Sequence, residues 1–300
     1  MRQSTRSRSR PRLPSLPNTA GFNGIGTQWE IESREPLPAS VLELIEQRVA
    51  EFDRAYSRFR DDSLVSRIAR ETGTYQFPSD AGPLFALYRE LYEATDGAVS
   101  PLVGAALENL GYDRVYSLKQ AESAIPVPPW DEAFGWDGSR LTVLRPVVVD
   151  VGAAGKGYLV DLVAARLREC GIDEYVVDAS GDMVQAGPEV CRVALEHPLD
   201  STKAIGVVEL QDRALCSSAT NRRHWGSGLH HVIDVATGLP TRNVIATWAL
   251  APTALLADGL ATALFFVGEE KLSRFEFEFV RMFSDGRIEH SANFEGELFQ

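Results

Sequence analysis

The sequence predicts an α+β fold, built as one domain behind a short N-terminal tail. Three observations carry this prediction. Strand-like and helix-like segments are mixed along the chain rather than strictly alternating, which disfavours a doubly wound parallel sheet. No internal repeat and no evident linker divides residues 21–300. The 300 residues, of which 44% are hydrophobic and 24% charged, are typical of a soluble globular protein with a sizeable core.

The first twenty residues differ from the rest in composition. Residues 1–20 contain five arginines, four serines, three prolines and no acidic residue. They lack the apolar segment of a secretory signal, so we predict a disordered basic tail. The expected organisation is therefore a tail over residues 1–20 and one domain over residues 21–300.

The first half of the domain is predicted to begin with a strand and to continue with two packed helices. The strand is expected at residues 28–31, because this short apolar segment follows a Gly-Thr pair. Apolar residues at helical spacing predict helices at residues 37–59 and 82–95. A Pro-rich connector follows at residues 126–136.

The second half is predicted to be rich in strands. Short apolar or β-branched runs predict strands at residues 141–144, 147–151, 175–178, 191–195, 205–209 and 244–250. Helical periodicity predicts two further helices at residues 158–170 and 254–266.

The most informative stretch is VVVDVGAAGKGYLVDLVAARLREC, residues 147–170. An apolar run ends at Asp150, passes through a turn with three glycines and Lys156, and enters an amphipathic helix. A strand that leads through such a turn to a helix N-terminus can present N–H groups to a phosphate. The spacing matches neither the P-loop nor the dinucleotide-binding fingerprint. A phosphate site and a turn whose glycines only permit tight packing both remain open.

The helix at residues 254–266 carries two polar side chains on an apolar sequence, ALLADGLATALFF. Asp258 and Thr262 are four residues apart and therefore lie on one side of the helix. Leaving either one buried without a partner would cost about 1–3 kcal/mol. A divalent cation such as Mg²⁺, which prefers oxygen ligands, is one possible partner. The alternative is structural, with Thr262 bonded to the helix backbone and Asp258 capping a nearby loop.

Two adjacent histidines mark a possible site in GLHHVIDVATGLP, residues 228–240. Neighbouring residues of a strand point to opposite faces, so we expect at most one of His230 and His231 to face a site. Polar loops at residues 57–63, 95–101 and 215–221 are further candidates for ligand contacts, although each is equally compatible with an ordinary turn.

Net charge and cysteine content limit the partners. A formal net charge of −12 disfavours a nucleic-acid groove or an anionic membrane surface as the main partner, and no apolar run is long enough to span a bilayer. The three cysteines, Cys170, Cys191 and Cys216, lack paired spacing and suit reduced thiols. With no signal peptide and no N-terminal lipid-accepting cysteine, we expect a cytoplasmic protein.

Taken in order, several segments resemble the FAD:protein FMN transferases, the ApbE family. They lie at residues 26–27, 56–68, 95–113, 150–161, 180–187, 230–240 and 257–268. The resemblance implies a single, T-fold-related α+β domain with an FAD cleft. It also implies that the protein moves the FMN half of FAD onto a threonine hydroxyl of a target flavoprotein and releases AMP.

The resemblance assigns roles to individual residues. Asp258, Thr262 and the backbone carbonyl of Ala153 are implied as Mg²⁺ ligands, and His231 and Asp258 as catalytic residues. The residues implied to contact FAD are Ile25, Phe59, Ala98, Val99, Ser100, Asp150, Lys156, Ser218, His231 and Val232. Neutral His231 could act as the base that activates the acceptor hydroxyl, an effect of about 10²–10⁴-fold.

The sequence departs from the family pattern at a few of these positions. Ser100 stands where the family usually has aspartate, Ala219 where it has glycine, and Val235 where it has proline. Two alternatives therefore accompany the transferase prediction. One is a Mg²⁺-dependent FAD pyrophosphatase that produces AMP and FMN, and the other is a non-catalytic FAD-binding protein. An NAD(P)-dependent oxidoreductase is disfavoured by the glycine spacing.

Overall fold

An eight-stranded sheet forms the centre of the computed structural model, which describes residues 15–138, 140–221, 224–226 and 228–299. Every pair of neighbouring strands in this sheet is antiparallel. Its strands, in spatial order, are β1 (Asn18–Gly24), β2 (Thr27–Ser33), β6 (Tyr175–Asp178), β7 (Asp182–Ala186), β10 (Ala214–Ala219), β15 (Val244–Ala251), β16 (Glu278–Phe283) and β17 (Ile288–His290).

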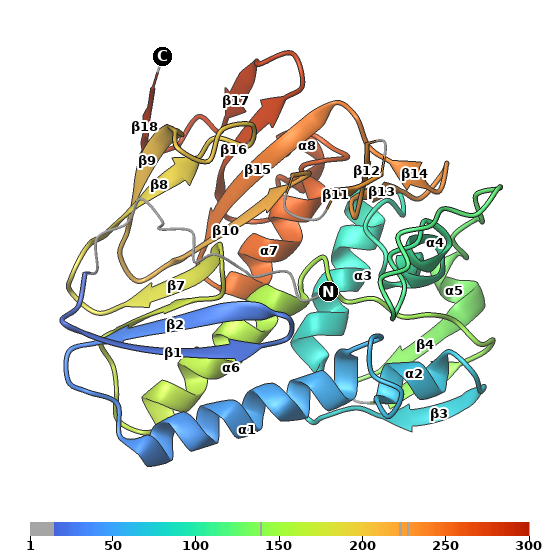
Figure 1. Cartoon of the computed structure of the whole chain (residues 1–300), viewed down its shortest axis with the longest axis horizontal. Coiled ribbons are helices and arrows are strands. Elements are labelled where there is room, and N and C mark those ends of the chain that lie inside the picture. The colour runs from blue at the N-terminus through green and yellow to red at the C-terminus, as the bar shows by residue number, and fades with distance from the viewer. Residues whose placement is uncertain (1–14, 139, 222–223, 227, 300) are drawn as a thin grey trace.

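Four long helices pack together on one side of this sheet (Figure 1). They are α1 (Ala39–Tyr56), α3 (Gly82–Ala94), α6 (Gly155–Glu169) and α7 (Ala254–Ala263). Each buries an apolar face, as Val41, Ile45, Val49 and Phe52 of α1 illustrate. These side chains repeat at intervals of three or four residues, so they fall on one side of the helix. The main hydrophobic core lies between these helices and the sheet.

A smaller sheet covers the other face. It contains β18 (Glu297–Leu298), β9 (Ala204–Leu210) and β8 (Cys191–Glu196), in that order. A second core lies between the two sheets, where Trp248 and Leu250 of β15 join Val193 and Leu210. Because β15 is covered on both faces, nearly all of its residues are buried.

Short elements surround these layers. A three-stranded sheet contains β3 (Gly73–Gln76), β5 (Arg140–Val143) and β4 (Phe134–Asp137). Short helical elements are α2 (Leu64–Ile68), a 3₁₀ turn (Pro101–Val103), α4 (Gly104–Asn109), α5 (Trp130–Ala133) and α8 (Glu269–Leu272). Two-residue strands pair as β11 (His224–Trp225) with β12 (Leu229–His230), and as β13 (Ile233–Asp234) with β14 (Leu239–Pro240). No helix among the described residues is long and apolar enough to cross a membrane.

The mixed α+β class is confirmed, but two predicted boundaries are wrong. β1 begins at Asn18, and the backbone N–H groups of Ser15 and Leu16 donate to Glu32 of β2. Residues 15–20 therefore belong to the domain rather than to the tail, and residues 1–14 lie outside the described residues. The helix expected at residues 158–170 begins earlier, at Gly155, so that Lys156 lies in its first turn.

The strand predicted at residues 147–151 is also wrong. This segment is largely buried and extended, yet it belongs to none of the sheets of the described structure. Its backbone is held instead by single hydrogen bonds, from Val147 N to Ile68 O at 3.4 Å and from Asp150 N to Pro101 O at 2.8 Å. Its β-branched residues are buried under neighbouring helices and turns instead of in a sheet. A run of buried apolar residues looks the same in the sequence in both situations.

Candidate functional site

A pocket of about 610 Å³ gathers most of the residues predicted to form the site. The predicted residues that line it are Ala98, Val99, Ser100, Asp150, Ala153, Ser218, His231, Val232 and Thr262. They come from the turn after α3, the loop before α6, strand β10, the loop after β12 and helix α7. Segments far apart in the sequence thus meet at one cavity.

The helix α7 brings Asp258 and Thr262 to the loop before α6. The hydroxyl of Thr262 donates to the carbonyl oxygen of Ala153 at 3.1 Å. Asp258 is buried, with 4% of its surface exposed, and its Oδ2 accepts a hydrogen bond from Gly157 N at 2.9 Å. The backbone oxygen, hydroxyl and carboxylate expected to bind a metal ion are therefore attached to elements in direct contact.

The glycines of the turn serve close packing. A Cβ atom on Gly157 would collide with the carbonyl oxygen of Ala254, and one on Gly155 would lie 2.8 Å from Val151 Cγ2. The N–H of Gly157 is already bound by Asp258. Tight packing therefore accounts for these two glycines.

Asp150 shapes the loop that carries Ala153. Its Oδ1 accepts a hydrogen bond from Gly152 N at 2.7 Å, and its Oδ2 accepts one from Arg58 Nε at 2.6 Å. Arg58 is itself buried, so this ion pair is shielded from solvent. Asp150 thus lines the pocket while its carboxylate holds the backbone of the neighbouring turn.

The two adjacent histidines separate as predicted. His231 lines the pocket, whereas His230 is buried and bonded to the backbone. His230 Nε2 lies 2.8 Å from the carbonyl oxygen of Thr241, and its Nδ1 accepts a hydrogen bond from Val232 N at 3.3 Å. Burial lowers the pKa of His230, which favours the neutral ring that these two bonds require. His230 thereby fixes the backbone on both sides of His231.

Three of the residues implied to contact FAD do not line this pocket. Lys156 Nζ lies 3.1 Å from Oδ2 of the fully buried Asp182. Ile25 occupies the turn between β1 and β2 with φ of 44°, an unusual conformation for a β-branched residue. Phe59 stacks on Tyr116, with ring centroids 5.3 Å apart. A contact of these three with FAD stays a prediction.

Sequence reasoning missed several apolar residues of the pocket wall, among them Tyr112 and Phe266. Tyr112 packs against Phe59 with ring centroids 5.5 Å apart, so Phe59 lies behind the wall. Both missed residues fall inside segments that carry the family resemblance. That location was the only available signal, because an apolar residue in a pocket resembles a core residue in the sequence.

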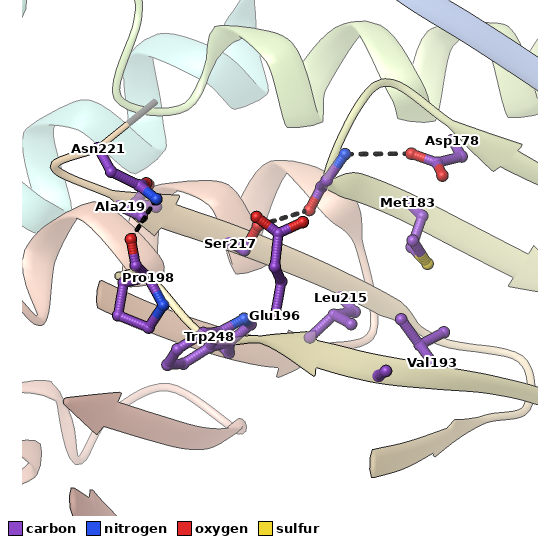
Figure 2. A pocket seen from close by; sticks show the side chains of 13 residues that line it. Asp178, Met183, Val193, Glu196, Pro198, Leu215, Ser217, Ala219, Asn221 and Trp248 are labelled. Carbon is purple, nitrogen blue, oxygen red and sulfur yellow. Dashed lines mark hydrogen bonds between the residues drawn. The ribbon is translucent and has the colours of Figure 1, made fainter. Parts of the chain in front are cut away.

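A second pocket, of about 690 Å³, shares Ser218 with the first. Figure 2 shows it between strands of the central sheet and β8 of the smaller sheet, with Met183, Val193, Leu215 and Trp248 among its apolar side chains. Polar groups are also present, namely Glu196, Ser217 and the buried Asp178, whose Oδ1 accepts a hydrogen bond from Gly181 N at 3.1 Å. The sequence did not predict this cavity, because its residues follow ordinary strands and meet only through the strand order.

Comparisons with known proteins identify the family to which this chain is similar. Residues 25–278 match the model of the ApbE family. The FAD:protein FMN transferase of Vibrio cholerae is 28% identical over 251 residues, which cover 76% of this chain and 73% of that protein.

Solved structures show the same fold. The flavin transferase ApbE from Vibrio cholerae gives a TM-score of 0.75 at 22% identity, covering 93% of this chain and 98% of that one. The ApbE protein from Thermotoga maritima gives a TM-score of 0.79 at 23% identity, with the same coverage. The predicted single ApbE-like α+β domain is thereby confirmed.

Proposed function

The chain belongs to the ApbE family, and from this premise we propose that it is an FAD:protein FMN transferase. The acceptor is a threonine hydroxyl of a target flavoprotein, and the products are the FMN-modified protein and AMP. The observation that carries the proposal is the convergence, on one pocket, of residues that the resemblance assigned to FAD and metal binding from separate parts of the chain.

The donor groups implied to bind a metal fit Mg²⁺, although only Ala153 and Thr262 line the pocket and Asp258 is buried on α7. Ala153 O, Thr262 Oγ1 and the Asp258 carboxylate are all hard oxygen ligands, and the first two are 3.1 Å apart. Mg²⁺ typically takes few protein oxygens and completes its coordination with phosphate and water. No cluster of three or more His, Cys, Asp or Glu side chains suited to a metal occurs in the described part of the chain, and this site does not require one. Bound Mg²⁺ would neutralise charge on the phosphate oxygens.

We assign the acceptor proton to His231, which lines the pocket. In the proposed reaction the threonine oxygen attacks the phosphorus of the FMN half, and the bond between that phosphorus and the AMP oxygen breaks. The threonine proton passes to His231, and AMP leaves as the phosphate monoester. Because His230 fixes the backbone beside it, His231 can hold its position in the pocket wall without a change in the loop.

The second pocket is a candidate site for one of the two ring systems of FAD. FAD carries two planar groups on either side of a pyrophosphate, and the two pockets meet at Ser218. In the proposal, one ring system of FAD occupies the first pocket and the other occupies the second.

The test combines FAD, Mg²⁺ and a candidate acceptor protein with an exposed threonine, and it measures AMP release and acceptor mass. Asp258→Ala tests the metal site, and Asp131→Ala, which removes an exposed carboxylate elsewhere, is the matched control. We expect an FMN-sized mass gain that only Asp258→Ala abolishes. AMP release without a mass gain, across several acceptors, would identify a pyrophosphatase. FAD binding without AMP release would identify a non-catalytic binding protein.

A further inference from the structure

Both polar groups of the Ala153 backbone are held by hydrogen bonds, one on each of the two peptide groups that meet at this residue. Its carbonyl oxygen accepts the hydrogen bond from Thr262, and its N–H donates to the phenol oxygen of Tyr88 at 3.2 Å. Tyr88 lies in the middle of α3 and is completely buried. Tyr88 does not line the pocket, and the family resemblance did not assign it a role.

The helix that carries Tyr88 is packed closely against the helix that carries Thr262. A Cβ atom on Gly259 of α7 would lie 2.8 Å from Leu91 Cδ1 and 3.0 Å from Leu87 Cδ2, both on α3. These leucines flank Tyr88 in the sequence, and the close approach leaves little freedom for α3 to shift along α7. The close packing of α3 on α7 therefore holds the Tyr88 hydroxyl in a fixed position relative to Thr262.

We propose that Tyr88 is a positioning residue for the Mg²⁺ site: by holding the N–H of Ala153, it aims the carbonyl oxygen of the same residue at the cation. This inference rests on the proposed function, because the carbonyl matters only if the metal binds there. Groups that orient a metal ligand typically change metal affinity by about 10–100-fold when they are removed.

Tyr88→Phe tests the proposal because it removes only the hydroxyl. The same helix provides a matched control in Tyr92, which lies about one helical turn after Tyr88. Its hydroxyl accepts a hydrogen bond from Trp130 N at 3.3 Å. Tyr92→Phe thus removes an equivalent bond between a phenol and the backbone that involves no site residue.

Two quantities are measured at increasing Mg²⁺ concentrations. FAD binding is monitored by flavin fluorescence, and the rate of AMP release is measured over the same range. For Tyr88→Phe we expect the half-maximal Mg²⁺ concentration to rise about 10-fold in both assays, with kcat at saturating Mg²⁺ within about twofold of wild type. Tyr92→Phe should follow the wild-type Mg²⁺ curve.

Two negative results are distinguishable. If Asp258→Ala abolishes the Mg²⁺ response while Tyr88→Phe and Tyr92→Phe both behave as wild type, the metal site stands and the role of Tyr88 is refuted. If the Mg²⁺ response persists in Asp258→Ala, the proposed metal site is wrong and the inference about Tyr88 falls with it.

Discussion

Asp161 and Asp258 each bind the N-terminal turn of the helix that carries the other. Asp161 of α6 accepts hydrogen bonds from Ala254 N at 2.9 Å and Leu255 N at 2.8 Å, at the start of α7. Asp258 of α7 accepts the N–H of Gly157, in the first turn of α6. Both carboxylates satisfy donors that helix N-termini leave unpaired, and both interact favourably with the helix dipole. This exchange fixes the relative placement of the two helices that form one end of the site.

Asp161→Asn should remove a pH dependence of stability. Burial raises the pKa of Asp161 from 3.8 to about 6, although its two backbone hydrogen bonds lower it. The folded protein therefore binds this proton at a higher pH than the unfolded chain does. The contribution of Asp161 to the free energy of unfolding then rises as pH falls from about 7 to about 4, by roughly 3 kcal/mol.

Because asparagine does not titrate, the Asp161→Asn variant is the reference against which the pH dependence of the wild type is measured. Urea unfolding of both proteins between about pH 7 and pH 4 should show wild type gaining stability relative to Asp161→Asn as the pH falls. A difference that stays constant over this range would show that Asp161 keeps an ordinary pKa.

Gly157→Ala should disrupt the contact between α6 and α7. The added Cβ would lie 2.6 Å from Asp258 Cβ and closer still to the carbonyl oxygen of Ala254. Overpacking of this kind costs about 1–3 kcal/mol and would also displace Asp258. Gly135→Ala is the control, because its Cβ would meet nothing closer than Thr142 Cβ at 3.7 Å.

Thermal unfolding and FAD binding measure the two effects. We expect a lower Tm and weaker Mg²⁺-dependent FAD binding for Gly157→Ala, and neither change for Gly135→Ala. Equal behaviour of the two variants would mean that the helices can separate at no cost.

The sequence singled out the polar candidates because each stands out locally, and the family resemblance then implied their roles, which stay predictions. Asp258 and Thr262 interrupt an apolar helix, and His231 follows a short strand. By contrast, the cavity that Ser218 shares with Trp248 and Leu215 depends on which strands are neighbours and on how a second sheet lies over them. Such relations involve residues far apart in the chain, and no local pattern reports them.

Tyr88 and the segment at residues 147–151 show the same limit in the fold. Tyr88 occupies a buried position of an amphipathic helix, so its spacing predicts core packing and gives no sign of the contact with Ala153. The segment at residues 147–151 has the sequence pattern of a strand, because buried β-branched residues form the same pattern in a sheet and beneath helices. In both cases tertiary contacts determined what local preference could not.

Lys156→Met should destabilise the protein through Asp182. Asp182 has no exposed surface, and Lys156 Nζ, 3.1 Å from its Oδ2, is the cation paired with it. Removing one partner of a buried ion pair leaves the other charge without compensation, at a cost of about 3–5 kcal/mol for a fully buried pair. Because Lys156 is partly exposed, we expect a smaller loss of about 2 kcal/mol.

The double variant Lys156→Met/Asp182→Asn separates stability from ligand binding. Replacing the stranded carboxylate with a neutral amide should recover most of the lost free energy of unfolding, as measured in urea. If FAD affinity recovers together with stability, Lys156 acts through the fold. If FAD affinity stays low in a stable double variant, Lys156 contacts the ligand.

His231→Gln should abolish transfer while leaving FAD binding nearly intact. His231 lines the pocket, and the bonds by which His230 holds the backbone on both sides of it do not involve the His231 ring. Glutamine keeps a side chain of similar reach but cannot take up the threonine proton. The expected loss in kcat is about 10²–10⁴-fold, the usual contribution of a general base.

His290→Gln, on β17 at the edge of the central sheet, is the control. AMP release, acceptor mass and FAD affinity would be measured for both variants. A His231→Gln protein that transfers FMN at nearly the wild-type rate would exclude His231 as the proton acceptor, whereas parallel loss of FAD affinity and transfer would show that it mainly holds the substrate.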